Sequence, residues 1–364
     1  MKVIFNDLGA QYAAYKTEID RAISTVLEHG QFIMGPEVRE LESQLADYVG
    51  VRHCVSVGSG TVSLEIALRA IGVGHGDEVI TSSFSWISSA EVISLVGATP
   101  VFVDIVPSTF NLNHDLLESV VTERTKAIIP VSLFGQTPDL TAISQVAARF
   151  GIPVIEDGAQ SFGAMWQDRK SCGGTLIGST SFFPAKVLGC YGDGGALFTD
   201  DDELAEKMSA IRTHGGIKRN DHRYVGTNGR LDTLQAAVLL AKLPHLDDEI
   251  RRRREIAHQY TATLEPHVLT PIESEGATHV FGQYTVRVPD RERVQRALIE
   301  AGVPSAVYYP RGIHEQPVYG ELGYRESDLP EVHKATREVL SLPIHPFMGD
   351  NEVDFVTSVM LGVL

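Results

Sequence analysis

Cys54-Val55-Ser56-Val57-Gly58-Ser59-Gly60-Thr61 joins a short β-branched strand to a glycine-rich turn, and a helical pattern follows at once. The next hundred or so residues repeat this order of strand, turn and helix. We predict strands at residues 54–57, 78–81, 99–103, 127–130 and 153–156, and helices at 60–71, 86–95, 112–121 and 140–150. Such alternation predicts an α/β fold, with a mixed, mostly parallel sheet covered by helices on both faces.

The remainder of the chain continues this pattern and then changes. Further strands are expected at 182–183 and 196–199, followed by a buried helix at 231–240 and a long charged helix at 247–264. A strand at 284–288, a helix at 291–301 and a strand at 306–309 indicate a smaller α+β unit. We therefore expect a large domain at 1–245 and a small C-terminal domain at 246–364, with residues 1–30 as candidates for packing on the small one.

Length and composition narrow the function classes. The chain has 364 residues, 43% of them hydrophobic, which is enough to bury a large core. Its formal net charge of -16, from 47 acidic and 31 basic side chains, argues against a nucleic-acid partner. The one basic cluster, Arg251 to Arg254, falls in a helical pattern and is typical of a solvated or interface face.

Membrane, disulfide and metal sites are not expected. No segment reaches the roughly 20 apolar residues that span a bilayer. The three cysteines, Cys54, Cys172 and Cys190, are too few and scattered for a disulfide framework or a zinc site, which favours reduced thiols in the cytoplasm. The histidines also lack the spacing of metal ligands.

The glycine-rich turn after the first strand is a candidate phosphate site. Backbone N–H groups at the start of the next helix, with the Thr61 hydroxyl, could bind a phosphate dianion. The turn has neither the G-x-G-x-x-G spacing of a Rossmann fold nor the G-K-[ST] of a P-loop. A purely structural turn remains an equal alternative at this point.

Three further side chains complete a possible cofactor site. Trp86 follows the second strand, where an indole could stack on a flat ligand or could simply belong to the core. Asp157 ends an apolar strand, and a positive ring nitrogen would satisfy its buried carboxylate. Lys186, close after Ser181-Phe182-Phe183, could form a Schiff base if burial removed its proton, although a structural lysine would be about as common.

The order of these residues resembles that in the DegT/DnrJ/StrS family of sugar-nucleotide aminotransferases, within the fold-type I pyridoxal phosphate enzymes. The resemblance covers essentially the whole chain. It rests on Phe5-Asn6-Asp7-Leu8, Gly35-Pro36-Glu37-Val38, Gly76-Asp77-Glu78-Val79-Ile80, Glu156-Asp157-Gly158-Ala159-Gln160, Gly194-Gly195-Ala196, Asn228-Gly229-Arg230-Leu231-Asp232 and Ser341-Leu342-Pro343.

The resemblance implies a role for each matched residue. It makes Lys186 the Schiff-base lysine and general base, and Asp157 the partner of the pyridinium nitrogen. The implied cofactor contacts are Gly60, Thr61, Trp86, Asp157, Gln160, Ser181, Lys186 and Asn228. Because Asn228 matches a residue that reaches the phosphate from the neighbouring subunit, the family likeness also implies a homodimer with shared active sites. Glutamate is the amino donor that the family implies.

Within the family, Thr125 to Leu133 and Leu188 to Gly195 resemble UDP-2-acetamido-2-deoxy-3-oxo-glucuronate aminotransferases. This likeness implies amination at C3 of a UDP-sugar, for a surface polysaccharide, lipid A or O-antigen. The implied substrate contacts are Gly30, Phe32, Ala185, Arg230, Tyr308 and Tyr309. That group tends to have tyrosine at 32, serine at 185 and histidine at 308, so this chain has lost two hydroxyls and one possible cation.

These differences leave the sugar open. A 3-oxo-glucuronate leads, the neutral 3-oxo form of UDP-N-acetylglucosamine follows, and a dTDP-linked 3- or 4-keto-6-deoxy sugar is the third alternative. Two other classes are alternatives: a sugar dehydratase, in which the lysine is replaced, often by histidine, and a non-catalytic protein of the same fold. Retention of Lys186 together with Asp157 and Ser181 disfavours both.

Overall fold

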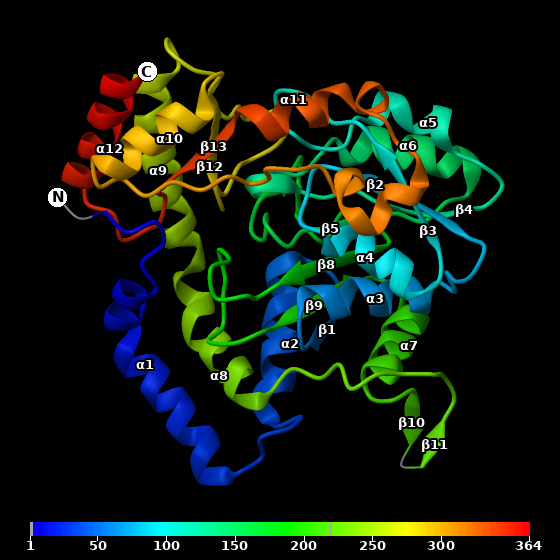
Figure 1. Cartoon of the computed structure of the whole chain (residues 1–364). Helices are drawn as coiled ribbons and strands as arrows, with labels where there is room; N and C mark the ends of the chain where they lie inside the picture. Colours follow the sequence, from blue (N-terminus) through cyan, green and yellow to red (C-terminus); the bar gives the residue numbers. More distant parts are fainter. Residues whose placement is uncertain (1–2, 219) are drawn as a thin grey trace.

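A central sheet of seven strands organises the protein in the computed structural model, which describes residues 3–218 and 220–364 (Figure 1). Its strands are β1 (His53–Val57), β2 (Glu78–Ser82), β3 (Thr99–Val103), β4 (Thr125–Ile129), β5 (Ile155–Asp157), β8 (Ile177–Ser181) and β9 (Gly195–Thr199). They form a four-stranded part, β1-β9-β8-β5, and a three-stranded part, β3-β2-β4. Two parallel bridges, Ile128 to Val154 and Val131 to Asp157, join the two parts.

Only β9 runs against its neighbours in this sheet. It pairs antiparallel with β1 and with β8, whereas β8 with β5, β4 with β2, and β2 with β3 are parallel pairs. The parallel strands place their carboxyl ends at one edge, which is where open α/β sheets bind ligands. The predicted mixed, mostly parallel sheet is therefore confirmed.

Helices cover both faces of the sheet because alternate strand residues point to opposite sides. Val55 and Leu197 lie in an apolar cluster under α3 and α7, whereas Cys54 and Phe198 lie in a second cluster under α2 and α8. The helices around the sheet are α2 (Pro36–Val49), α3 (Gly60–Ala70), α4 (Ser88–Leu95), α5 (Leu117–Val120), α6 (Leu140–Phe150), α7 (Asp202–Arg212) and α8 (Thr233–Lys242).

The first helix, α1 (Leu8–His29), packs along α8 (Figure 1). The Asp7 side chain accepts a hydrogen bond of 2.8 Å from the N–H of Ala10 and so caps its start. Gly30 ends the helix with a φ of 70°, a left-handed conformation that glycine adopts without strain.

The C-terminal part has its own apolar cluster. It contains α9 (Leu246–Leu264), β12 (Tyr284–Arg287), α10 (Arg291–Glu300), α11 (Pro330–Glu338), β13 (Val339–Leu342) and α12 (Asp350–Val363). The antiparallel pair β12 and β13 packs on Tyr260 of α9 and Val356 of α12, and Val3 joins the same cluster. We propose that the two domains meet near residue 245.

Two predicted strands were wrong. Instead of residues 182–183, β8 comprises Ile177–Ser181, because the ladder with β9 ends at Ser181 and the Ser181 hydroxyl takes the N–H of Phe183 at 3.3 Å. Residues 306–309 form no strand, since only Ala306 pairs, with Ser341. The predicted helix at 112–121 is reduced to a 3₁₀ turn and α5.

Four short strands form two hairpins outside the main sheet. They are β6 (Met165–Trp166), β7 (Arg169–Lys170), β10 (Gly216–Lys218) and β11 (Asp221–His222). The β10 and β11 pair projects away from the sheet beyond α7 (Figure 1). Among the described residues, no helix has the length and apolar character needed to cross a membrane.

Candidate active site

Asp157 ends β5, in the middle of the sheet, at the edge where ligands are expected. Its side chain is buried, with an exposed fraction of 5%. Burial raises the pKa of this carboxyl, and three groups oppose that effect: the Ser89 hydroxyl at 2.9 Å, the Ala159 N–H at 3.2 Å and the charge of Lys186. The site therefore holds a buried carboxylate that a further cation would stabilise.

Lys186 lies in the loop between β8 and β9, close enough to Asp157 for their charges to interact. A tight turn, in which the Lys186 N–H donates to the Phe183 carbonyl at 2.9 Å, fixes its backbone. Burial lowers the pKa of the Lys186 amine, and the Asp157 carboxylate opposes this shift. A lysine with a lowered pKa has more of the neutral amine that attacks a carbonyl carbon.

The start of α3 presents unpaired N–H donors and is the candidate phosphate site, called the cradle below. The Ser59 side chain caps the helix by accepting the N–H of Val62 at 3.1 Å, while the N–H groups of Gly60 and Thr61 meet no acceptor in the described part of the protein. A Cβ on Gly60 would lie 2.7 Å from the Ser181 Cβ, so glycine lets the Ser181 hydroxyl approach these free donors. Free N–H groups at a helix start bind phosphate well.

An aromatic wall lies beside this cradle and carboxylate. Trp86 is 60% exposed, unusually high for an indole, and its ring centroid lies 6.4 Å from that of Tyr309. The Gln160 amide nitrogen donates to the Tyr309 hydroxyl at 3.1 Å, and its oxygen accepts the N–H of Phe134 at 2.9 Å. The exposed Trp86 ring is thus open to a flat ligand, beside a Tyr309 that Gln160 holds in place.

These groups fit pyridoxal phosphate. The cradle would hold the phosphate, Trp86 would cover one face of the ring, and the Asp157 carboxylate would pair with the ring nitrogen. Lys186 would make the covalent link to the cofactor aldehyde. No group of side chains with the spacing of a metal site occurs among the described residues.

The structure divides the predicted substrate residues into two groups. Ala185, Tyr308 and Tyr309 lie on the Lys186 side: the Ala185 carbonyl accepts a hydrogen bond from Asn6 at 3.3 Å, and the Tyr308 ring packs edge-on against another aromatic near the N-terminus. Tyr309 adjoins Trp86. These three residues could therefore contact a substrate within one protomer.

Gly30, Phe32 and Arg230 form the second group, and Asn228, the implied phosphate contact from a neighbouring subunit, is described with them. The Phe32 carbonyl accepts the N–H of Thr233, and Phe32 is 46% exposed. Asn228 is exposed, whereas the Arg230 carbonyl lies against Gly58 of the phosphate turn. Contacts that would join Phe32 or Asn228 to Lys186 are absent from the described part of a single protomer.

Sequence reasoning missed the serines that support the site. Ser89 donates to Asp157, and Ser88 exchanges a hydrogen bond of 2.8 Å with Thr61. Both lie on α4, just after Trp86. The signal was a run of hydroxyls in a buried segment, Ser82-Ser83-Phe84-Ser85-Trp86-Ile87-Ser88-Ser89.

Glu156 is a second buried carboxylate next to Asp157. It accepts hydrogen bonds of 2.7 Å from the hydroxyls of Ser132 and Ser171 and from the N–H of Cys172. These three donors stabilise the buried carboxylate, so the role of Glu156 is structural. It fixes β5 between the neighbouring segments and thereby sets the position of Asp157.

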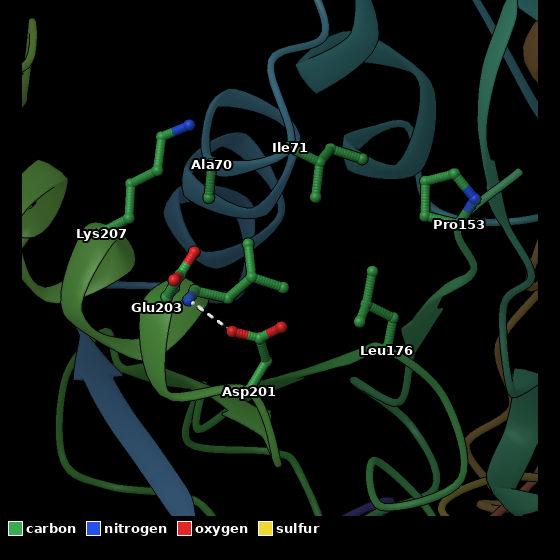
Figure 2. A pocket seen from close by; sticks show the side chains of 8 residues that line it. Ala70, Ile71, Pro153, Leu176, Asp201, Glu203 and Lys207 are labelled. Atoms are coloured by element: carbon green, nitrogen blue, oxygen red, sulfur yellow. Dashed lines mark hydrogen bonds between the residues drawn. The ribbon is translucent and has the colours of Figure 1, made fainter.

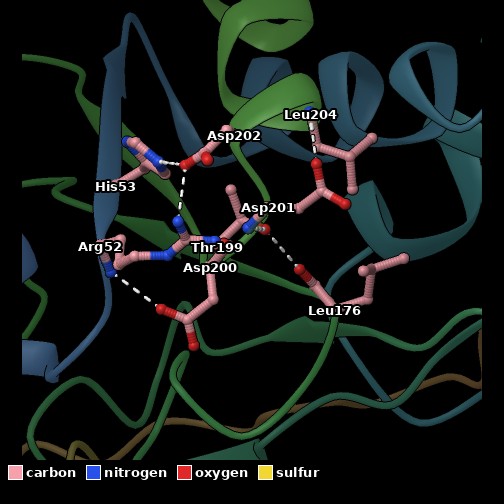
Figure 3. A network of polar contacts seen from close by, with 8 residues as sticks. All are labelled: Arg52, His53, Leu176, Thr199, Asp200, Asp201, Asp202 and Leu204. Carbon is pink, nitrogen blue, oxygen red and sulfur yellow. Dashed lines mark hydrogen bonds and ion pairs between the residues drawn. The ribbon is translucent and has the colours of Figure 1, made fainter.

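Two surface hollows lie away from this site. One of about 380 Å³, between the end of α3 and the start of α7, is lined by Ile71, Leu176 and Lys207 among others (Figure 2). The other adjoins a polar network in which Asp202 accepts hydrogen bonds from Arg52 at 2.9 Å and His53 at 2.6 Å (Figure 3). None of the predicted site residues lines either hollow.

Comparisons with known proteins show which family the chain resembles. A model of the DegT/DnrJ/EryC1/StrS aminotransferase family matches residues 14–361. A UDP-2-acetamido-2-deoxy-3-oxo-D-glucuronate aminotransferase from Pseudomonas aeruginosa is 49% identical over 357 residues, covering 98% of this chain and 99% of that protein. A UDP-N-acetyl-3-dehydro-alpha-D-glucosamine 3-aminotransferase from Acidithiobacillus ferrooxidans is 39% identical, covering 98% and 97%.

The fold has a similar match. The crystal structure of NtdA from Bacillus subtilis, with bound cofactor PMP, superposes with a TM-score of 0.92 at 31% identity. The alignment covers 100% of this chain and 85% of that one.

Proposed function

Because this chain belongs to the DegT/DnrJ/EryC1/StrS aminotransferase family, we propose that it moves an amino group from glutamate to the C3 keto group of a UDP-2-acetamido-3-oxo sugar. The cofactor of this transaminase is pyridoxal phosphate. The observation that carries the proposal is the convergence of Lys186, Asp157 and the free N–H groups of α3 at one edge of the sheet.

Each side chain has a distinct task in this reaction. The cofactor, when bound, supplies an electron sink for the carbon that loses its proton. Asp157 would keep a proton on the ring nitrogen, because its buried carboxylate favours a neighbouring positive charge. The Nζ of Lys186 would take the proton from the α-carbon of the amino donor, and its lowered pKa leaves more of the neutral amine that a general base needs.

The UDP-sugar is supported by both named relatives, which act on 3-oxo UDP-sugars according to their names. Arg230 could pair with a carboxylate or diphosphate. The 3-oxo-glucuronate aminotransferases that the chain resembles tend to have tyrosine, serine and histidine where this chain has Phe32, Ala185 and Tyr308. Each lost polar partner would weaken binding by about 1 to 3 kcal/mol if buried. We favour the uronate, with the neutral sugar next.

A homodimer with shared active sites is part of the proposal. Phe32 and Asn228 are exposed in the protomer and make no contact with Lys186 among the described residues. The family likeness nevertheless assigns them to the active site. A second copy could bring its own Asn228 to the phosphate cradle. The projecting β10 and β11 pair, which precedes Asn228, is consistent with an arm that reaches a neighbour (Figure 1).

We also propose a place for the product. The aminated sugar would enter a surface polysaccharide or a part of lipopolysaccharide, namely lipid A or the O-antigen. The enzyme would work in the cytoplasm, where its buried free cysteines, Cys54, Cys172 and Cys190, stay reduced.

Spectroscopy and substrate assays test the proposal. Purified protein with pyridoxal phosphate should show a visible absorbance band that glutamate removes, and the Lys186→Ala variant should lack this response. C3-aminated UDP-sugars should then convert in the reverse direction with 2-oxoglutarate. Failure of both the uronate and the neutral form would end the C3 assignment, and turnover of a dTDP-linked amino sugar instead would favour the alternative.

The three substituted positions refine the sugar assignment. Tyr308→His should raise kcat/KM for the uronate more than for the neutral sugar, because it restores a possible cation. Tyr308→Phe, at the same position, serves as the control that introduces no cation. Equal changes in kcat/KM for both sugars in Tyr308→His would show that Tyr308 does not discriminate between them.

A further inference from the structure

The loop that carries Lys186 rests on two side chains of α8. Lys242 is 3% exposed, and its Nζ donates a hydrogen bond to the Gly189 carbonyl. Gln235, two turns earlier on the same helix, accepts the N–H of Tyr191 at 2.8 Å and donates to the Tyr191 carbonyl at 3.4 Å. These hydrogen bonds all go to the loop backbone and do not depend on the loop side chains, although the Lys242 Nζ also lies 5.4 Å from the centroid of the Tyr191 ring.

The loop itself is closed into a tight arc. The Cys190 N–H donates to the Phe182 carbonyl at 2.8 Å across the base of the arc. A Cβ on Gly189 would lie 2.5 Å from the Pro184 carbonyl oxygen, so little space remains inside. Since Lys186 lies midway along this arc, a shift at Gly189 would be passed to the lysine backbone.

A charge in this position needs an explanation. Burial lowers the pKa of Lys242 to about 8, and the Glu249 carboxylate opposes that shift. Glu249 is itself buried and accepts two hydrogen bonds from Gln11, at 3.0 and 3.1 Å. The buried Arg253 adds a second positive charge nearby, which disfavours the protonated Lys242 further. An apolar side chain of similar volume would avoid the desolvation cost of the lysine.

We propose that Lys242 and Gln235 are positioning residues that hold the Phe182–Cys190 arc and thereby set the place of the Lys186 amine relative to Asp157. A charged donor makes the stronger hydrogen bond to a carbonyl, which accounts for a lysine at 242. The proposal rests on the proposed role of Lys186 as the cofactor lysine. Neither α8 residue would touch substrate or cofactor.

The alternative is a purely structural role for the two residues in packing α8. Both accounts expect some loss of stability when the side chains change. They differ in where the change appears: a packing role affects the whole helix, whereas a positioning role affects the arc and the lysine.

Hydrogen exchange on the cofactor-free protein separates the two accounts. We would compare amide exchange in the peptide 183–192 and in α8 for wild type, Lys242→Met, Gln235→Leu and Lys242→Arg. Lys170→Met is the control, because Lys170 is a half-buried lysine whose Nζ lies over the Tyr48 ring and not on this loop. The dissociation constant for pyridoxal phosphate and the separate values of kcat and KM for glutamate would be measured for each variant.

We expect Lys242→Met to speed exchange in 183–192 and to weaken cofactor binding, each by about tenfold, as the loss of one charged hydrogen bond implies. Its kcat should fall with little change in KM, and Lys242→Arg should recover most of both. Gln235→Leu should act on the same peptide in the same direction. If Lys242→Met fails to fold, Gln235→Leu decides the question alone.

Exchange in 183–192 that matches wild type, or that changes only together with all of α8, would overturn the proposal. So would a Lys170→Met control that behaves like Lys242→Met. Failure of the wild type to bind pyridoxal phosphate would sink the proposed function instead, and the exchange data would still report on the loop.

Discussion

The Ser89 hydroxyl donates a hydrogen bond of 2.9 Å to the Oδ2 atom of Asp157 and connects α4 to the end of β5. Both residues are buried, Ser89 with 1% of its surface exposed and Asp157 with 5%. Burial raises the pKa of Asp157, and this hydrogen bond is the first of the interactions that oppose it. The charge state of Asp157 therefore depends in part on a residue of α4, which lies far from β5 along the chain.

Ser89→Ala should lower kcat by about tenfold, because removing a hydrogen bond to a buried charge costs about 1.4 kcal/mol or more. The pKa of Asp157 should rise further without this donor, so the loss should grow as pH falls. Steady-state kinetics from pH 5.5 to 8.5 would measure it. Ser94→Ala is the control, since Ser94 lies on the same helix and contacts Tyr319 at 3.4 Å. Identical pH profiles for Ser89→Ala and wild type would contradict the role of Ser89.

Gly60→Ala should weaken cofactor binding more than it destabilises the fold. The new Cβ would lie 2.7 Å from the Ser181 Cβ and would push apart the two sides of the phosphate cradle. We expect at least about a tenfold higher dissociation constant for pyridoxal phosphate, measured by fluorescence titration of the cofactor-free protein. Gly74→Ala, whose Cβ would have no neighbour closer than 3.9 Å, should leave binding unchanged. Equal affinity for pyridoxal phosphate in the two variants would show that Gly60 does not form part of the cradle.

His279 should make the folding stability depend on pH. Burial, with a smaller effect of Arg254, lowers the pKa of His279 to about 3, and its Nδ1 accepts the N–H of Phe281 at 2.9 Å. Below about pH 6.5 the unfolded state therefore binds one proton more than the folded state. The contribution of His279 to the free energy of unfolding is fully present above that pH and is lost as the pH falls toward 3.

Urea unfolding of the cofactor-free protein at pH 7.5 and 5.0 measures this effect. The contribution of His279 should amount to about 2 kcal/mol between the two values. His279→Asn keeps an acceptor for the Phe281 N–H and should lose that part of the pH dependence, while His267→Asn, at an exposed position, should keep it. The same pH dependence in all three proteins would show that His279 is not buried in the neutral form.

Mixed dimers test the sharing of active sites. Lys186→Ala removes the lysine from one site, and Asn228→Asp places a negative charge where the neighbouring subunit would approach the phosphate. Each variant should be nearly inactive alone. Random exchange of subunits between them should recover about a quarter of wild-type activity, because half of the dimers would carry one intact site. No recovery after verified subunit exchange would argue that each site is built from one protomer.

Much of the fold could be predicted from the sequence because strand and helix alternate with clear boundaries. The strand Thr99–Val103 and the helix Leu140–Phe150 have the predicted ends. The position of β8 was missed because its residues are small and polar. A Cβ on Gly178 would lie 2.1 Å from the Cys172 carbonyl oxygen, so tertiary contact selects glycine there at the expense of a strand-like pattern.

The chemical groups of the candidate site could be singled out from the sequence, whereas the residues that support them could not. Lys186 and Asp157 stood out because a charge in or at the end of an apolar segment needs a partner. Ser89 is 68 residues from Asp157 along the chain, and Lys242 is 53 residues from Gly189. Such contacts arise from the packing of α4 and α8 on the sheet, which no local pattern reports.

The assignment of Lys186 as the cofactor lysine is tested most directly by locating the covalent link. Borohydride reduction of the protein saturated with pyridoxal phosphate, followed by digestion and mass spectrometry, would identify the modified lysine. We predict a single modified site at Lys186. Modification at Lys170 or Lys242 instead, or a protein that takes up no label while still folded, would contradict the account.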